Sequence, residues 1–189
     1  RYRRARIRKK KKDGRAVRIV VDIGQNANVD KAKGFMRAAA GMAACKFLES
    51  RNISVELWAY EGANDAFQSH AISGHNQDLS TMWRVKDSKT RINLTTVATT
   101  MSTWFFRSFI FQTMHSYRYN GFRPKSTLGT SRSPSMDEVA TILDSQKSYV
   151  LSASTSGSVE QCRESAMKSA RNIIEKAMRQ TYAADQRHI

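Results

Sequence analysis

The sequence predicts an α/β protein: a Rossmann-like sheet of about four to five strands, mostly parallel with one hairpin, flanked by helices. Three observations favour this class. An apolar strand pattern at 16–22 is followed by a helical pattern at 30–51 and a second strand pattern at 53–60. Strand and helix patterns keep alternating after that, which is typical of right-handed crossovers over a parallel sheet. The 189 residues suffice for one domain with a substantial hydrophobic core.

The first strand is expected at residues 16–22 and the first helix at 30–51. Val and Ile follow one another in the strand instead of alternating with polar residues, so we expect it to be buried on both faces. Asp22 ends the strand at the position where open α/β sheets bind ligands. In the helix, Ala and Gly residues allow a close approach to the sheet. Asp30 lies near its start, and Asn52 is the expected stop.

The middle of the chain predicts a strand pair and then a long helix. Residues 53–60 form the second strand, and the alternating residues 82–86 predict a half-exposed strand at the edge of the sheet. Residues 94–117 predict a long helix with an aromatic middle, in which Met101, Phe105 and Phe109 are expected to face the sheet.

A short helix, a strand and a long helix complete the predicted domain. Residues 118–134 have the composition of a loop. Ser135 is expected to cap a helix that runs to Leu143. A strand at 149–151 and a helix at 159–179 with a continuous apolar stripe follow.

The net charge of +16 is concentrated in an N-terminal arm, residues 1–14. Residues 1–12 contain nine of the 32 Lys and Arg residues and no acidic residue. Such a segment has too little apolar surface to fold alone, so we expect it to be disordered or ordered only by a partner. Residues 15–182 form the predicted α/β domain, and residues 183–189 form a polar tail.

The arm is expected to bind a polyanion, with nucleic acid, either DNA or RNA, as the favoured partner. Release of counterions from phosphates favours such binding irrespective of base sequence. An acidic protein surface, or no binding role, stays open as an alternative. The predicted contact residues are Arg1, Arg3, Arg4, Arg6, Arg8, Lys9, Lys10, Lys11, Lys12 and Arg15. Basic residues that could extend this surface are Arg84, Lys86, Lys89, Arg91, Arg123, Lys125 and Arg132.

The two cysteines predict neither a disulfide nor a zinc site. Cys45 and Cys162 lie within separate predicted helices without metal-ligand spacing, so we expect two buried core residues. No apolar run approaches ~18 residues, so neither a membrane span nor a membrane partner is expected.

A resemblance to a known family begins at the first strand. The segment IVVDIGQNANVDKAKGFMRAAAGMAACKFLESRNISVELWAYEG, residues 19–62, resembles the opening of a von Willebrand factor A-type domain. It is most similar to a phage and bacterial group of such domains with a degenerate metal-site motif, in which a Phe-Phe-Arg stretch, here residues 105–107, comes later. The resemblance covers most of residues 16–180. It implies a von Willebrand A-type sheet and a protein of phage or mobile-element type, either in the cytoplasm of a bacterial host or associated with a virion.

The resemblance also implies a degenerate ligand loop after the first strand. The family's Asp-x-Ser-x-Ser positions match Asp22, Gly24 and Asn26, and Thr95 matches the family's threonine. A divalent cation needs several hard oxygen ligands, whereas this loop offers one carboxylate and one amide. We therefore expect no cofactor and no metal site, with Asp22 as only a weak candidate for Mg²⁺. The alternative role of Asp22 and Asn26 is to accept hydrogen bonds from backbone N–H groups.

Two functions follow from the sequence and stay open. The first is a non-enzymatic binding or assembly protein, whose arm contacts nucleic acid and whose α/β domain contacts a protein partner or a second copy of the chain. The second is a Mg²⁺-dependent nuclease, because the strand ending at Asp22 is also similar to the first strand of PIN and NYN ribonucleases. That chemistry needs further carboxylates, for which Asp65, Asp87 and Asp144 are the candidates. Only 16 acidic residues are present, which favours the first function.

Overall fold

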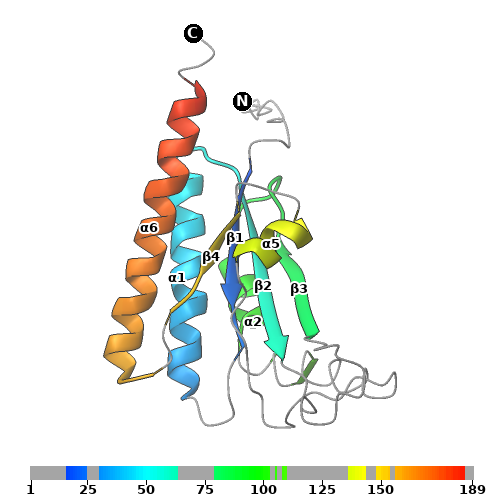
Figure 1. Cartoon of the computed structure of the whole chain (residues 1–189), viewed down its shortest axis with the longest axis vertical. Helices are drawn as coiled ribbons and strands as arrows, with labels where there is room; N and C mark the ends of the chain where they lie inside the picture. The colour runs from blue at the N-terminus through cyan, green and yellow to red at the C-terminus, as the bar shows by residue number, and fades with distance from the viewer. Residues whose placement is uncertain are drawn as a thin grey trace, which may run out of the picture.

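The computed structural model describes residues 16–24, 30–63, 79–102, 105, 108–109, 136–143, 148–153 and 156–185. Within these residues the chain has the α/β fold that the sequence predicts, and the predicted arm at 1–14 lies outside them (Figure 1). The elements in chain order are β1 (Val17–Asp22), α1 (Lys31–Ser50), β2 (Val55–Ala63), β3 (Leu79–Lys86), α2 (Leu94–Thr100), α5 (Met136–Leu143), β4 (Ser148–Leu151) and α6 (Val159–Asp185).

The described strands form one mixed, four-stranded sheet in the order β3-β2-β1-β4. β1 is central and runs parallel to both β2 and β4, while β3 is antiparallel to β2. β1, β2 and β4 therefore end at the same side of the sheet, which we call the carboxyl end, and begin at the opposite side, the amino end. Because β3 runs the other way, the segment that follows Lys86 lies at the amino end. β3 is the edge strand that its sequence pattern predicts.

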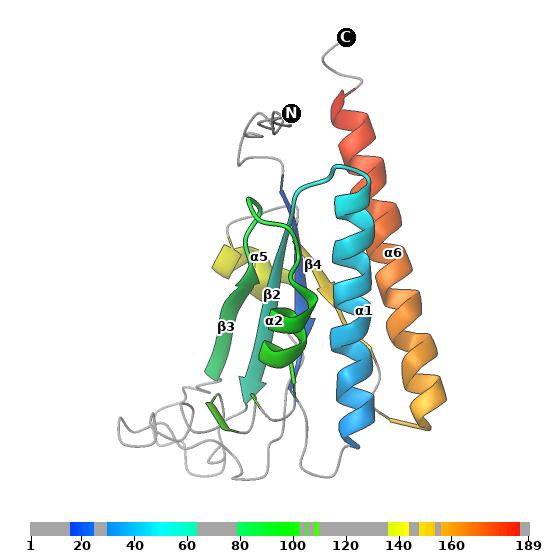
Figure 2. The same cartoon turned by 180° about the vertical axis from the view of Figure 1, so that it is seen from behind.

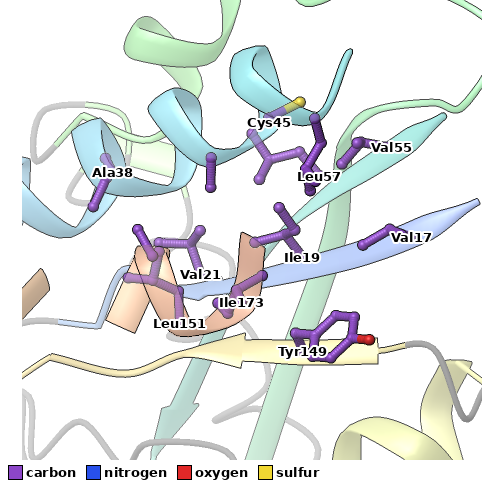
Figure 3. Packing of buried hydrophobic residues seen from close by; sticks show 14 of the residues in the cluster. Val17, Ile19, Val21, Ala38, Cys45, Val55, Leu57, Tyr149, Leu151 and Ile173 are labelled. Carbon is purple, nitrogen blue, oxygen red and sulfur yellow. The ribbon is translucent and has the colours of Figure 1, made fainter. Parts of the chain in front are cut away.

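Helices cover both faces of this sheet. α1, α2 and α6 pack on one face and bury the larger core, which includes Ile19, Leu57 and Ile173 (Figures 2 and 3). α5 packs on the other face, where Val139 lies in a smaller cluster with Tyr60. β1 is therefore buried on both faces, as predicted. None of the helices in the described ranges combines the length and the apolar content that crossing a bilayer requires.

α1 begins and ends where its sequence signals predict. The Asp30 side chain accepts a hydrogen bond from the Ala32 N–H at 2.9 Å and caps the N-terminus. At the other end Asn52 has a φ of 61°, a left-handed conformation that asparagine tolerates better than most residues. This turn directs the chain from the end of α1 into β2.

The two cysteines are core residues, as predicted. Cys45 and Cys162 are both free and buried. Burial raises the pKa of the Cys45 thiol to about 12, so this group remains a neutral thiol at physiological pH.

The predicted helix at 94–117 begins at Leu94 as expected but is not continuous, because α2 ends at Thr100 and Met101 and Ser102 are not helical, whereas Phe105 is helical again. Hydroxyl groups here bond to the backbone and compete with helix continuation. Ser102 Oγ donates to the Thr99 carbonyl at 2.7 Å and accepts from the Phe105 N–H at 3.1 Å. Phe109 was expected to face the sheet but is 51% exposed. Residues 103–104, 106–107 and 110–135 lie outside the described residues.

α1 approaches β1 closely at one glycine. A Cβ atom added at Gly41 would lie 2.5 Å from Cγ2 of Val21, which is fully buried in β1. Real Cβ atoms essentially never approach neighbours this closely, so a larger residue at this position requires the Val21 side chain, the helix or the strand to shift.

Gly41→Ala should therefore destabilise the protein. The steric cost of overpacking, about 1–3 kcal/mol, should exceed the gain in helix propensity, about 1 kcal/mol. Urea unfolding gives the difference in the free energy of unfolding. The matched control is the same substitution with Val21→Ala, which removes the clashing methyl group and should make Gly41→Ala neutral or stabilising. Increased stability of Gly41→Ala alone would contradict the close approach.

Candidate functional site

The candidate site lies at the carboxyl end of the sheet and begins with Asp22, the last residue of β1. Asp22 is only 2% exposed. Its Oδ1 accepts a hydrogen bond from the Gly24 N–H at 2.9 Å, and its Oδ2 accepts one from Arg37 Nη1 at 2.8 Å. The bond to Gly24 is the backbone role that the sequence left open as an alternative for Asp22.

Arg37 lies in the second turn of α1, and its side chain reaches the end of β1. The Arg37 and Asp22 side chains are 5% and 2% exposed, so they form a buried ion pair. Arg37 Nη2 also donates to the Gly24 carbonyl oxygen. One guanidinium group therefore binds both the carboxylate that ends the strand and the backbone that follows it.

Glu61 adds a second carboxyl group from the neighbouring strand, β2. It is 2% exposed. Burial raises the pKa of Glu61 well above its ordinary value, the negative charge of Asp22 raises it further, and the positive charge of Arg37 opposes both effects. Within the described part of the chain, Glu61 Oε2 and Arg37 Nε have no hydrogen-bond partner. The site thus contains one cation and two carboxyl groups, an arrangement that favours a protonated Glu61.

This cluster of Asp22, Arg37 and Glu61 disfavours a divalent cation beside Asp22. Both oxygens of the Asp22 carboxylate already accept hydrogen bonds, one of them from a group with a fixed positive charge. Oxygen ligands of Mg²⁺ or Ca²⁺ must be directed at the ion and must offset its charge. The described residues contain no group of three or more His, Cys, Asp or Glu side chains that could bind a metal ion.

The other residues of the predicted ligand loop contribute little to this cluster. Gly24 contributes its backbone N–H and carbonyl groups. Thr95 lies in the first turn of α2 and is exposed, whereas Asp22 is buried, so the structure does not present the two side chains as a pair of ligands. Asn26 lies outside the described residues.

Sequence reasoning missed Arg37 and Glu61, although both carry a detectable signal. Arg37 lies at helical spacing from the buried Gly34 and Gly41, so it falls on the face of α1 that packs on the sheet. Glu61 continues the alternation of Leu57 and Ala59 in β2, which both face the larger core. A charged residue at a buried position usually has a charged partner, and that rule would have joined these two residues to Asp22.

Of the further carboxylates predicted for a nuclease, the described residues include only Asp87, and it does not lie near Asp22. Asp87 follows β3 at the amino end of the sheet, opposite Asp22. Its Oδ1 accepts hydrogen bonds from the Thr90 and Lys89 N–H groups at 2.8 and 2.7 Å, and these bonds lower its pKa. Asp65 and Asp144 lie outside the described residues.

The amino end carries several of the predicted basic residues. Arg84, Lys89 and Arg91 are exposed, as a binding surface requires. The expectation for Lys86 is wrong, because Lys86 is 5% exposed. Its ammonium group donates to the Val55 and Asp87 carbonyl oxygens, both at 2.7 Å, and pairs with Glu49 Oε1 at 2.9 Å. The predicted contact residues Arg1 to Arg15, and also Arg123, Lys125 and Arg132, lie outside the described residues.

The fold and the site define an α/β protein with a buried guanidinium–carboxylate cluster where its parallel strands end. The chain belongs to the family described as Domain of unknown function (DUF7192), which matches residues 2–179. No curated protein and no solved structure matches the chain.

Glu61→Gln should change how stability depends on pH. Because the pKa of Glu61 is raised in the folded state, the unfolded state loses this proton first, and stability falls as pH rises above the ordinary value of 4.5. The neutral amide of Gln removes this loss. Urea unfolding between about pH 4 and about pH 8 should show a variant equal to the wild type at the acid limit and increasingly more stable above it. The exposed Glu160→Gln is the control, and parallel curves for Glu61→Gln and the wild type would contradict the assignment.

Arg37→Met should be strongly destabilising. It leaves the buried Asp22 carboxylate without its cation, and removing one partner of a buried ion pair costs about 3–5 kcal/mol. Adding Asp22→Asn should recover part of that loss, because no uncompensated charge remains. The control is Arg163→Met, which breaks the exposed pair with Glu160 and should have little effect. Equal losses for the two arginine variants would show that the buried pair contributes nothing particular.

Proposed function

We propose that this chain is a non-enzymatic binding and assembly protein that contacts nucleic acid through its basic N-terminal arm. The observation that carries the proposal is the charge of residues 1–12, with nine Lys and Arg residues and no acid. Phosphate contacts of this kind give affinity without reading base sequence. The match to the family begins at residue 2 and so includes this segment.

The described structure supports this proposal at the point where the arm joins the domain. The first residues of β1 lie at the amino end of the sheet, and the Val17 N–H donates to the Ser54 carbonyl oxygen at 2.9 Å. Lys89 and Arg91 are exposed at the same end. A polyanion bound to the arm would therefore meet further positive charge on the folded domain.

We propose in addition that the sheet is of the von Willebrand A type. The central β1, the crossover through α1 to the parallel β2, and the antiparallel β3 beside β2 support this assignment. The position of Asp22 at the tip of β1 supports it too, since the metal motif of that family begins there. The phage or mobile-element type, and a protein partner or second copy on the α/β domain, are proposed from the sequence resemblance alone.

The absence of enzymatic activity is part of the proposal, supported by the Asp22–Arg37 pair. A metal-dependent nuclease would need Asp22 to bind Mg²⁺ directly. In the described residues the Asp22 carboxylate binds Arg37 instead, and Asp87, one of the three candidate partners, lies at the other end of the sheet. The alternative of a PIN- or NYN-type nuclease therefore gains no specific support.

Replacing the nine basic residues of the arm by Ser should greatly weaken binding to DNA and RNA. Proteins with several phosphate contacts lose about 10³–10⁵ in affinity between about 50 and 200 mM salt, and this dependence should become much shallower in the variant. Fluorescence anisotropy with labelled DNA and RNA measures both quantities. Unchanged affinity, or salt-independent binding by the wild type, would exclude the arm as the contact. Cleavage of the probe that requires Mg²⁺ and is lost in Asp22→Asn would instead establish the nuclease.

A further inference from the structure

We propose that the folded domain has a phosphate-binding surface of its own at the amino end of the sheet, formed by Lys46, Arg51, Lys89 and Arg91. We call these four residues the amino-end surface. The inference rests on the proposed function, and it adds that nucleic acid bound by the arm also lies across the folded domain. All four side chains are exposed.

Two segments far apart in the sequence form this surface, and partly buried polar contacts join them. Glu49, near the end of α1, pairs with Lys86 at 2.9 Å, and its Oε2 accepts a hydrogen bond from the Ile92 N–H at 3.1 Å. The segment that contains Lys89 and Arg91 is therefore fixed against the end of α1. Lys46 precedes Glu49 by three residues and so lies on the same side of the helix.

Arg51, the remaining member of the amino-end surface, lies close to the point where the arm joins the domain. The Val17 N–H donates to the carbonyl oxygen of Ser54, which follows Arg51 by three residues. The Arg51 guanidinium lies 5.4 Å from the centre of the Phe47 ring. Stacking on a ring restricts the guanidinium but leaves its N–H donors available for phosphate oxygens.

The acidic groups near the amino-end surface offset only part of its charge. Both oxygens of Glu49 are engaged, one by Lys86 and one by the Ile92 N–H, so the buried pair contributes no net charge. Asp87 stays ionised, with its Oδ1 bound to backbone N–H groups. The surface therefore exposes four cations beside the Asp87 carboxylate, and a polyanion is the complementary partner.

The chemistry of the surface favours the sugar–phosphate backbone over the bases. Lys and Arg side chains on a fixed backbone contact phosphate oxygens and position a nucleic acid without reading its sequence. Log affinity falls with log salt concentration, and each phosphate contact makes this slope steeper by about 0.9 for duplex DNA. The amino-end surface should thus add a measurable increment to the slope set by the arm.

The test compares two full-length variants with equal loss of charge. The surface variant carries Lys46→Gln, Arg51→Gln, Lys89→Gln and Arg91→Gln. The control variant carries Lys31→Gln, Arg163→Gln, Lys168→Gln and Arg171→Gln, which replace exposed residues of α1 and α6 away from the surface. A short labelled DNA duplex is the probe, and binding is measured by anisotropy over a range of salt concentrations. Circular dichroism melting checks that each variant is folded. If the full surface variant is not folded, the double variant Lys89→Gln, Arg91→Gln replaces it.

The surface variant should bind at least ~10-fold more weakly than the control at ~0.1 M salt, with a slope smaller by about 3–4. Equal effects in the surface and control variants would overturn the inference, because net charge alone would then explain them. If replacing the basic residues of the arm weakens binding but the surface variant binds like the wild type, the inference is also overturned, and the proposed function stays intact. Failure of the unmodified chain to bind the duplex would overturn both.

Discussion

The buried ion pair between Arg37 and Asp22 is the interaction on which the carboxyl end of the sheet depends. β1 is central and covered on both faces, so a carboxylate at its tip is removed from water. Leaving that buried charge without its partner would cost about 3–5 kcal/mol. Arg37 supplies the opposite charge and also binds the Gly24 carbonyl oxygen. Helix α1, strand β1 and the start of the following loop are thereby fixed as one unit.

A second, partly buried ion pair fixes the other end of α1. Lys86 and Glu49 join the edge strand β3 to the last turn of the helix, and Gly41 brings the middle of the helix into close contact with β1. The charged residues next to the two ion pairs nevertheless differ in exposure. At the carboxyl end the charges of the described cluster are internal, whereas at the amino end Lys89 and Arg91 lie outside the buried pair and remain exposed. Lys86 therefore has a structural role, whereas Lys89 and Arg91 remain accessible to solvent.

The sequence was sufficient for the elements whose signals are local. The apolar run at 16–22, the cap at Asp30 and the stop at Asn52 depend on neighbouring residues, and each appears in the structure as predicted. The sequence did not predict the roles of Arg37 and Glu61, because their partners are distant in sequence and only the fold brings them together. The burial of Lys86 was not predicted for the same reason. A lysine in an alternating edge strand is usually solvated, but here it pairs with Glu49 of α1. At the end of α2, local hydroxyl groups outweighed the helical spacing of apolar residues.

The proposed phosphate-binding surface and Asp22 lie at opposite ends of the sheet. β1 spans six residues from Val17 to Asp22, and a strand rises about 3.3 Å per residue, so its ends are about 17 Å apart. Metal-assisted cleavage needs oxygen–metal contacts of about 2.0–2.6 Å. A phosphate held at the amino end is therefore far outside the reach of the Asp22 carboxylate, which already binds Arg37. The exposed positive charge at one end and the carboxylate paired with Arg37 at the other therefore support the proposal of a protein that binds nucleic acid without cleaving it.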